Sequence, residues 1–360
     1  MGQLASQTTT AQCHRPDADS PFVSIIMPIR NEADFIERAI RSILHNSYPT
    51  EKMEVLVVDG MSDDGTREII HRLSQGDSRI RMLDNPKRIV PAAMNIGLKA
   101  ARGDLFIRID GHAEIPPDFI SKSIQCLREH PQAWVVGGPI RTVADSYTGR
   151  AVSAAMRSPI GVGNARFRLG EYEGWVDTLA FGTHHKWVID KVGWFDEELV
   201  RNQDDDFNLR IILAGGKIWM SKAIQSTYFS RGSLPKLWRQ YFQYGFWRIR
   251  TLQKHKKPAT FRQLVPLIFV WSLLLLGLAG VAWRPLWILL AVEVVLYVLG
   301  LIAGVVDVGR KAGWRCAPVA PVIFAILHFA YGTGSLWGAV RFCILKGRGL
   351  TKPQEMQMSR

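Results

Sequence analysis

The sequence predicts an α/β fold with a mixed, mostly parallel sheet, followed by helices that span a membrane. Between residues 22 and 136, short apolar runs rich in β-branched residues alternate with segments of amphipathic helical spacing. This alternation is the pattern of βαβ units. Beyond about residue 262 the chain changes to long apolar runs that few charges interrupt. We therefore expect a globular front and a membrane-bound back.

The predicted strands and helices of the front part follow one another along the chain. The expected strands are 22–28, 55–58, 80–83, 105–109 and 134–136. The expected helices are 32–46, 66–73, 91–101 and 118–129. Polar clusters follow several of the strands, and parallel sheets bind ligands at the carboxyl ends of their strands. The sequence therefore predicts a ligand site at that edge of the sheet.

Three apolar segments close the chain, at residues 264–283, 286–306 and 317–340. Each reaches the ~20 residues that a helix needs to cross a bilayer. Only Arg284 and Pro285 separate the first two, which predicts a helical hairpin, and Glu293 inside the second indicates an intramembrane partner or a water-filled contact. The third segment either spans or re-enters the membrane. We favour a re-entrant segment, because it returns the basic tail to the cytoplasm as the positive-inside rule requires.

The formal net charge of +13 is typical of proteins that bind nucleic acid, phosphate ligands or anionic membranes. Nine Lys or Arg and no Asp or Glu lie between residues 231 and 262, directly before the first apolar run. We expect this basic collar to contact anionic lipid heads, at roughly 1 kcal/mol per cation. Nucleic acid is excluded as a partner, because zinc-finger spacing and RNA-recognition signatures are absent from the sequence.

The cysteines and the first residues favour a cytoplasmic location for the front part. Cys13, Cys126, Cys316 and Cys343 lie far apart, without metal or disulfide spacing. The first twenty residues are polar and lack the apolar core of a signal peptide. We expect an integral protein of the inner membrane whose α/β domain faces the cytoplasm. Its predicted parts are a flexible tail (1–20), an α/β domain (21–230), a basic interfacial segment (231–262), a membrane domain (263–345) and a basic tail (346–360).

Two polar turns that follow predicted strands carry candidate ligand-binding residues. Asp59 can accept hydrogen bonds from a base or a ribose, and Asp64 would lie near a sugar or phosphate, although a solvated acidic turn is the alternative. Asp110 and His112 project from one loop and can share one divalent ion, either Mg²⁺ or Mn²⁺. Such an ion offsets the charge of a diphosphate and activates it as a leaving group. An ordinary loop histidine is the alternative for His112.

Three adjacent carboxylates, Asp204, Asp205 and Asp206, precede a helical run. They can simply complement the helix dipole. An acidic cluster near a cleft can also hold the general base that removes a proton from an attacking hydroxyl group. Asp204 is the first candidate for this base and Asp206 the second.

Two further stretches contain candidates for contact with an acceptor. His184 and His185 are adjacent loop histidines, which are often incidental. Aromatic and basic residues alternate between residues 238 and 248 at helical spacing, which is typical of an interfacial helix, with an ordinary packed helix as the alternative. The acceptor candidates are His184, His185, Trp238, Arg239, Gln240 and Trp247.

Six motifs in this order resemble the family-2 inverting glycosyltransferases, which have a GT-A, Rossmann-like fold. They lie at residues 24–32, 59–66, 93–97, 103–110, 193–197 and 203–206, and the resemblance covers about residues 22–247. It implies that a nucleotide-sugar donor is bound by Pro28, Arg30, Glu32, Asp59, Asp64, Asn95 and Asp110. It also implies that Asp110 and His112 hold Mn²⁺ or Mg²⁺ and that Asp204 is the general base.

Two positions depart from the family pattern. His112 stands where the metal motif has a second Asp, which leaves the choice of metal open, and Gln203 replaces the Glu of the family's Glu-Asp motif. The subgroup that the sequence resembles most makes bacterial exopolysaccharides of the succinoglycan type. Processive synthases carry a Gln-x-x-Arg-Trp motif, which has only a distant counterpart at residues 243–247. This difference favours transfer of a single sugar.

The resemblance implies a hexosyltransferase that moves a sugar by direct displacement from a nucleotide-sugar, most often a UDP-sugar, to a lipid-linked oligosaccharide. The expected partners are the donor, the lipid-linked acceptor, anionic membrane lipids and other polysaccharide-assembly proteins. One alternative is transfer directly to polyprenyl phosphate. Another is an inactive membrane scaffold or carbohydrate-binding subunit, against which the intact Asp59, Asp64, Asp110 and Asp204 argue.

Overall fold

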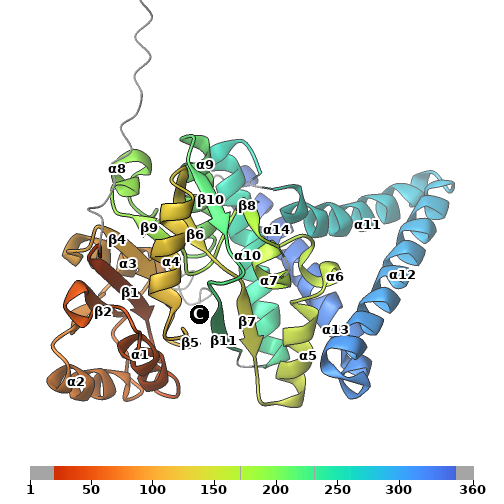
Figure 1. Cartoon of the computed structure of the whole chain (residues 1–360). Coiled ribbons are helices and arrows are strands. Elements are labelled where there is room, and N and C mark those ends of the chain that lie inside the picture. The colour runs from red at the N-terminus through yellow and green to blue at the C-terminus, as the bar shows by residue number, and fades with distance from the viewer. Residues whose placement is uncertain (1–19, 171, 231, 259, 346–360) are drawn as a thin grey trace, which may run out of the picture.

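The computed structural model describes residues 20–345, apart from residues 171, 231 and 259. The predicted N-terminal tail, except for residue 20, and the predicted basic C-terminal tail lie outside the described residues. Figure 1 shows an α/β body from which a pair of long helices projects on one side.

An eight-stranded mixed sheet forms the centre of the body, in the order β3-β2-β1-β4-β9-β6-β10-β8. Its parallel half contains β3 (Ile80–Asp84), β2 (Met53–Asp59), β1 (Val23–Ile29) and β4 (Leu105–Arg108). Its other half contains β9 (Thr183–His185), β6 (Ala133–Gly137), β10 (Lys217–Met220) and β8 (Gly174–Val176), of which β9 and β8 run antiparallel to their neighbours. The expected α/β class with a mixed sheet is confirmed.

Helices cover both faces of the sheet, and for this reason the central strands are apolar along their length. One face is covered by α1 (Ile36–Leu44), α2 (Thr66–Gly76) and α4 (Phe119–Glu129), and the other by α3 (Val90–Ala100), α8 (Val188–Val192) and α9 (Gln203–Leu213). All of β1 is buried: Ile25 and Met27 pack on the side of α1, α2 and α4, and Ile26 packs on the side of α3, α8 and α9. Successive side chains of a strand point to opposite faces, so β1 contributes to both cores.

The predicted strands and helices of residues 22–136 are present, with shifted ends. The largest difference is the start of α1, expected at residue 32 and observed at Ile36. Residues 32–35 form a turn instead, in which the Glu32 carbonyl accepts hydrogen bonds from the backbone N–H groups of Phe35 and Ile36, at 2.9 and 2.8 Å. The turn holds Glu32 close to the carboxyl end of β1.

Several short elements were not predicted from the sequence. A second sheet has the order β5-β11-β7 and consists of β5 (Ala113–Glu114), β11 (Ser226–Phe229) and β7 (Ile140–Val143). Between β7 and β11 along the chain lie the short helices α5 (Tyr147–Ala155), α6 (Pro159–Val162) and α7 (Arg166–Leu169). All of these elements except α5, which has nine residues, are two to four residues long and carry too little periodicity to be recognised. Helices α5 and α6 contact α12 and so connect the body to the apolar helices.

The basic segment 231–262 is mainly one long helix, α10 (Leu234–His255). It packs between the α/β body and the last apolar helix, and does not lie along the surface as predicted. Four cations of the segment pair with carboxylates of the body: Arg248 with Asp205, Arg250 with Glu198, Lys254 with Asp196 and Arg262 with Asp177. The predicted lipid-facing collar is therefore only partly available, because these cations neutralise acidic groups of the protein itself.

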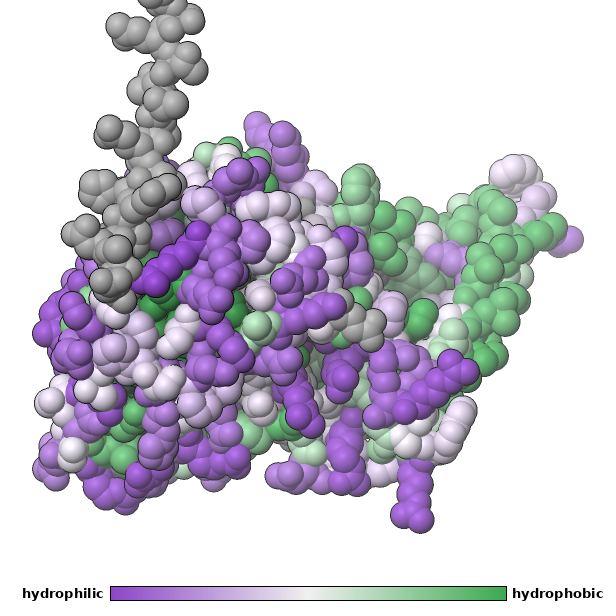
Figure 2. Space-filling model, in the orientation of Figure 1, coloured by the Kyte–Doolittle hydropathy of each residue, from purple (hydrophilic) through white to green (hydrophobic). Residues whose placement is uncertain are grey.

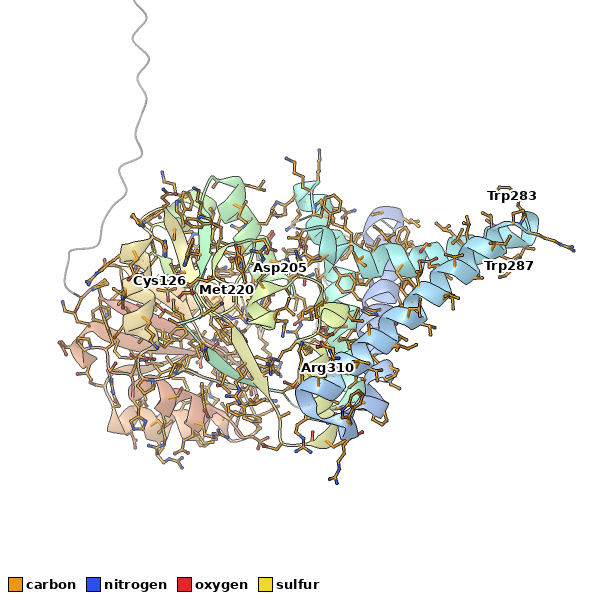
Figure 3. All side chains as sticks on the ribbon, turned by 45° about the vertical axis from the view of Figure 1, so that its right-hand side comes forward. Cys126, Asp205, Met220, Trp283, Trp287 and Arg310 are labelled. Atoms are coloured by element: carbon orange, nitrogen blue, oxygen red, sulfur yellow. The ribbon has the colours of Figure 1, made fainter. Side chains whose placement is uncertain are left out.

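Three helices in the described part of the chain are long and apolar enough to cross a membrane. The first two, α11 (Val265–Ala282) and α12 (Leu286–Ala312), form the predicted hairpin. The hairpin is the apolar projection of Figure 2, and Figure 3 shows Trp283 and Trp287 at its tip. Its outer side chains, such as Leu278 and Ile288, are 72% and 67% exposed, and an apolar surface of this size needs a membrane or a partner to cover it.

The third apolar run, residues 314–344, packs against α10. It consists of η3 (Trp314–Val319), α13 (Ala320–Ala325), η4 (Ile326–Ala330), α14 (Tyr331–Ala339) and η5 (Val340–Ile344). The contact is a close approach of backbones: a Cβ on Gly334 would lie 2.0 Å from the Phe242 carbonyl oxygen, and one on Gly245 1.9 Å from the Tyr331 carbonyl oxygen. The run is one helix of 31 residues, and that it re-enters the membrane stays a prediction.

We expect Gly334→Ala to destabilise the attachment of α14 to α10. The added methyl group meets a backbone oxygen that cannot rotate away, and such overpacking costs roughly 1–3 kcal/mol. Thermal unfolding of the full chain in detergent measures the effect. Gly277→Ala on α11 is the matched control, because a Cβ there meets nothing within 4 Å. Unfolding of both variants at the wild-type temperature would contradict a tight α10–α14 contact.

Candidate functional site

One cavity runs from the carboxyl ends of β1 and β4 to the apolar helices. Its volume of about 1330 Å³ exceeds the ~300–1,000 Å³ of ordinary small-molecule sites. Residues after β1 and β4 line one end, α9 and α10 line the middle, and α11 and α12 line the other end. A cavity of this extent can hold two substrates next to each other, as a group transfer requires.

Five of the predicted site residues line the end of the cavity in the α/β body: Pro28, Arg30, Glu32, Asp110 and His112. The Nε and Nη1 atoms of Arg30 are buried and have no hydrogen-bond partner among the described residues. A buried cationic donor without a partner is costly until an anion completes it. This end of the cavity is therefore suited to an anionic group such as a diphosphate, and we call it the donor end.

Asp59, Asp64 and Asn95, also predicted to contact the donor, do not line the cavity. Asp59 is fully buried and accepts a hydrogen bond from Ser62 Oγ at 2.5 Å, and Asp64 accepts one from the Thr66 backbone N–H at 3.1 Å. The hydroxyl groups of Ser62 and Thr66 in turn accept hydrogen bonds from the backbone N–H groups of residues 31 and 32. Asn95 binds the loop before α9. In this structure these residues do not contact the cavity themselves but hold the segments that line its donor end.

Arg108, at the end of β4, joins a predicted metal ligand, Asp110, to the predicted base, Asp204. Its Nε and Nη2 atoms donate to Asp110 Oδ1 at 2.9 and 2.8 Å, and its Nη1 atom pairs with Asp204. The candidate metal ligand and the candidate base are thus separated by one guanidinium group. Asp204 comes from α9, 94 positions further along the chain than Asp110, so only the fold brings the two together.

Asp110 and His112 lie on one loop, as predicted, and both side chains line the cavity. His112 Nδ1 is 2.9 Å from Glu32 Oε1, and its ring meets Tyr228 edge-on, with centroids 4.6 Å apart. No group of three or more His, Cys, Asp or Glu side chains among the described residues forms a complete metal site. The pair fits a divalent ion that takes its remaining ligands from water and substrate oxygens, as Mg²⁺ and Mn²⁺ do.

The first two carboxylates of α9 both reach the cavity but have different partners. Asp204 pairs with Arg108, and 44% of its side-chain surface is open to the cavity. Asp205 pairs with Arg248 of α10 and also accepts a hydrogen bond from Gln263 Nε2 at 3.3 Å. Figure 3 labels Asp205 at the junction of the body and the apolar helices. Asp204 is the more accessible of the two for a substrate hydroxyl.

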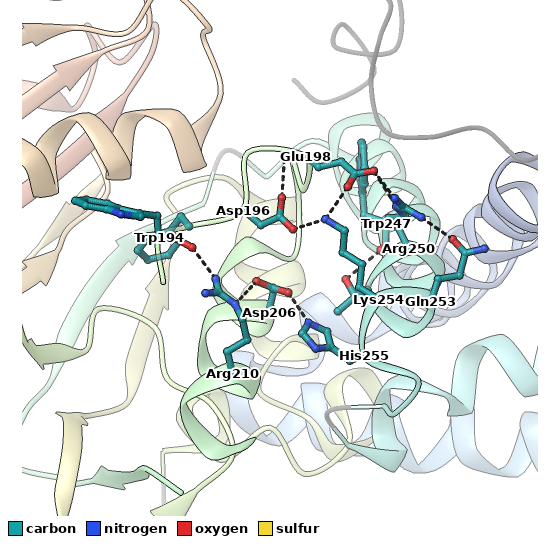
Figure 4. Close-up of polar contacts among 12 residues, drawn as sticks. Trp194, Asp196, Glu198, Asp206, Arg210, Trp247, Arg250, Gln253, Lys254 and His255 are labelled. Atoms are coloured by element: carbon teal, nitrogen blue, oxygen red, sulfur yellow. Dashed lines mark hydrogen bonds and ion pairs between the residues drawn. The ribbon is translucent and has the colours of Figure 1, made fainter. Parts of the chain in front are cut away.

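The third carboxylate of α9, Asp206, does not reach the cavity. It is buried and accepts hydrogen bonds from Arg210 Nε at 2.9 Å and from His255 Nε2 at 2.6 Å, as Figure 4 shows. Both of its oxygens are therefore occupied on the far side of the helix. In this structure Asp206 holds α9 against α10, and its carboxylate is not placed to meet a substrate in the cavity.

The surroundings of Asp204 shift its pKa upward. Although its side chain is open to the cavity, Asp204 lies away from bulk water, and this desolvation raises its pKa. The positive charge of Arg108 lowers the pKa, and the negative charges of Asp110 and Asp205 raise it. A raised pKa makes a carboxylate a better proton acceptor than an exposed one, because the catalytic pKa lies closer to the working pH.

Three of the six predicted acceptor residues line the cavity: His184, Arg239 and Gln240. The His184 ring stacks on Phe106 with centroids 4.6 Å apart, and its Nδ1 atom is 2.8 Å from the Gly182 carbonyl oxygen. Burial lowers the pKa of His184 to about 4, so the imidazole is neutral at physiological pH. The neutral His184 ring can therefore make an uncharged polar contact with a ligand in the cavity.

The other three predicted acceptor residues do not line the cavity. His185 follows His184 in β9 and so points to the opposite face of the sheet, where it stacks on Trp187. Trp238 is 42% exposed on the outer side of α10. Trp247 is buried against Phe342 of the last apolar run. The prediction that these residues contact an acceptor does not fit their positions.

The sequence reasoning missed the cations in the middle of the cavity, which are Arg168, Arg201, Lys236, Arg248 and Arg262. They come from four separate stretches of the chain, and their convergence has no sequence signal. The spacing of Gln240, Tyr244 and Arg248 did provide a sequence signal. Residues four apart share one face of a helix, and all three of these line the cavity.

Comparisons with known proteins identify relatives along most of the chain. The profile of glycosyl transferase family 2 matches residues 24–191. The succinoglycan biosynthesis protein ExoA of Rhizobium meliloti (strain 1021) is 34% identical over 246 residues, which are 68% of this chain and 74% of that protein. A Methanococcus voltae dolichyl N-acetyl-alpha-D-glucosaminyl phosphate 3-beta-D-2,3-diacetamido-2,3-dideoxy-beta-D-glucuronosyltransferase is 25% identical over 89% of this chain and 98% of its own.

A solved structure shares the fold. The mannosyltransferase PcManGT from Pyrobaculum calidifontis, in complex with GDP-Man and Mn²⁺, gives a TM-score of 0.59 at 20% identity, over 90% of this chain and 89% of that one. The expected GT-A fold is confirmed by this neighbour together with the family profile. With the identity to ExoA over most of both proteins, these findings show that the chain belongs to glycosyltransferase family 2.

Proposed function

We propose that this glycosyltransferase moves a single sugar from a nucleotide-sugar to a lipid-linked saccharide, with inversion, in the synthesis of a bacterial exopolysaccharide. The observation that carries the proposal is the single cavity, which contains Arg30, Asp110 and Asp204 and continues between α11 and α12. A relative in succinoglycan biosynthesis and a relative named for a dolichyl-phosphate-linked substrate support this type of acceptor.

The donor end would hold the diphosphate of the donor, which we propose to be a UDP-sugar. The unpartnered nitrogens of Arg30 would bind the phosphate oxygens. Asp110 and His112 would hold Mn²⁺ or Mg²⁺, which stabilises the negative charge of the departing diphosphate. The GDP-Man complex of PcManGT makes a GDP-sugar the alternative donor.

Asp204 would act as the general base. Its carboxylate takes the proton of the acceptor hydroxyl while that oxygen attacks the anomeric carbon, and the bond from this carbon to the diphosphate oxygen breaks. Attack from the side opposite to the leaving group inverts the configuration. Arg108 orients the carboxylate by their ion pair and keeps it charged. A scaffold without activity would not need an accessible carboxylate, a cation with buried and unpartnered nitrogens, and one cavity that contains both.

We further propose that the hairpin lies in the inner membrane and that the α/β body faces the cytoplasm. The tip of the hairpin carries one charge, Arg284, whereas the end of α12 next to the body carries Arg310 and Lys311, and Arg315 follows. The positive-inside rule places the more basic end in the cytoplasm. This arrangement brings the cavity to the height of a lipid head group.

We expect Asp204→Asn to lower kcat about 10²–10⁴-fold, because an amide cannot accept the hydroxyl proton. The Kd of the nucleotide-sugar should stay within about threefold of the wild-type value, because Asp204 does not bind the nucleotide-sugar in the proposed reaction. Single-turnover transfer assays and donor titrations on the purified full chain measure both quantities.

Asp206→Asn is the matched control for this substitution. We expect it to lower the midpoint of thermal unfolding, because it weakens the pairs with Arg210 and His255, and to leave kcat close to wild type below that midpoint. The base assignment would be wrong if Asp206→Asn abolished turnover in a stable protein while Asp204→Asn remained active.

The raised pKa of Asp204 predicts the pH dependence of the reaction. The base must be ionised, so kcat/KM should fall as the pH decreases through a pKa above the usual carboxyl range. Arg108→Gln removes the positive charge that opposes this shift, and we expect it to move the acidic limb to higher pH. An acidic limb that stays in place, or moves to lower pH, would show that another group controls it. Profiles of kcat/KM against pH for the two proteins make the comparison.

A further inference from the structure

The cavity continues beyond the catalytic carboxylates into the hairpin. There it is lined by an apolar arm, which we define as Phe269 of α11, Leu289, Val292, Leu296 and Gly300 of α12, and Leu327 of the third apolar run. In Figure 1, α11 and α12 meet at their tip, diverge toward the body and leave a wedge that the third run closes. The apolar arm is thus framed by three helices that are each long enough to cross a membrane.

Polar contacts between the helices stabilise this frame. Ser272 of α11 donates a hydrogen bond to Glu293 of α12, and the rings of Phe269 and Tyr297 stack with centroids 4.5 Å apart. His328 of the third run is 2.8 Å, through Nε2, from the carbonyl oxygen of residue 160 in α6. Glu293, Tyr297 and His328 also line the cavity, and Oε2 of Glu293 is buried without a hydrogen-bond partner among the described residues. The lining that these helices provide is therefore mainly, but not wholly, apolar.

The lining of the cavity combines three kinds of chemistry. The apolar arm, the cations Arg168, Lys236 and Arg262, and the carboxylates Asp110 and Asp204 all line it. Arg168 lies over the Phe167 ring at 5.2 Å, and no ion pair of Arg168 or Lys236 is found among the described residues. An amphiphile with an apolar chain, a diphosphate and a sugar hydroxyl carries one group that matches each of the three.

We infer that the apolar arm binds the first isoprenoid units of a polyprenyl-diphosphate-linked saccharide, which enters sideways from the bilayer. The inference rests on the proposed function and adds to it the binding site of the lipid. The chain lies between α11 and α12, and the diphosphate meets Arg168 and Lys236. The sugar hydroxyl then reaches Asp204.

Two glycines of the hairpin provide a matched test. A Cβ on Gly300 or on Gly277 meets nothing within 4 Å, so neither substitution distorts the backbone. Gly300 lines the cavity and Gly277 does not. Gly300→Phe therefore fills the apolar arm, whereas Gly277→Phe adds the same side chain outside it.

The probe is farnesyl diphosphate with a diazirine at its far end, photolysed with the full chain in lipid nanodiscs. We expect label in peptides of α12 for the wild type and for Gly277→Phe. Gly300→Phe should lower labelling about tenfold, since excluded isoprenoid carbons lose their burial free energy. Arg168→Gln should weaken labelling by the diphosphate but not by the corresponding farnesol probe. Equal labelling of the two glycine variants, or competition by phosphatidylglycerol as strong as by unlabelled farnesyl diphosphate, would overturn the inference.

Transfer activity separates this inference from the proposed function. If the wild type transfers sugar to a lipid extract and Gly300→Phe does so with the same KM, the function stands and the lipid site is wrong. If the wild type binds the probe in the apolar arm but transfers sugar to no lipid acceptor, the lipid site stands and the proposed function is wrong. Donor binding and thermal unfolding of each variant show that it is folded.

Discussion

The neutralisation of three adjacent carboxylates organises this structure. Asp204, Asp205 and Asp206 open α9, and like charges this close are unfavourable in a protein unless each finds its own partner. Arg108 reaches the first from the central sheet, Arg248 reaches the second from α10, and an Arg-His pair holds the third away from the cavity. The first turn of α9 therefore supplies the candidate base with Asp204, a link to α10 with Asp205, and an anchor for α9 itself with Asp206.

The second of these ion pairs connects the site to the apolar helices. Arg248 is buried and also donates from Nε to Tyr331 Oη of α14, at 3.2 Å. The backbones of α10 and α14 approach each other at Gly245 and Gly334, so the two helices have little freedom to shift. The hairpin and the base are thus held in a fixed relation. An enzyme that acts on a lipid-bound acceptor needs this relation, because the membrane fixes the height of the reacting hydroxyl.

The sequence allowed correct prediction of features with a local pattern: the buried strands, the amphipathic helices, the hairpin and the loop of Asp110. It could not show which aspartate of α9 faces the cavity, because the deciding partners lie up to 96 positions away. It could not separate His184 from His185, since the register of β9 between β4 and β6 decides which one points inward. Trp247 was expected to contact an acceptor, and its burial depends on packing against Phe342, which leaves no trace near residue 247.

Nucleoside diphosphate release by the detergent-purified full chain tests the central claim most directly. The chain is incubated with Mn²⁺ or Mg²⁺ and a panel of UDP- and GDP-sugars, with and without a bacterial membrane lipid extract. The account predicts metal-dependent release from one donor that rises when the extract is added, with the sugar recovered in the lipid fraction. Release that is indifferent to the extract would contradict a lipid-linked acceptor, and the absence of both release and nucleotide binding would contradict catalysis itself.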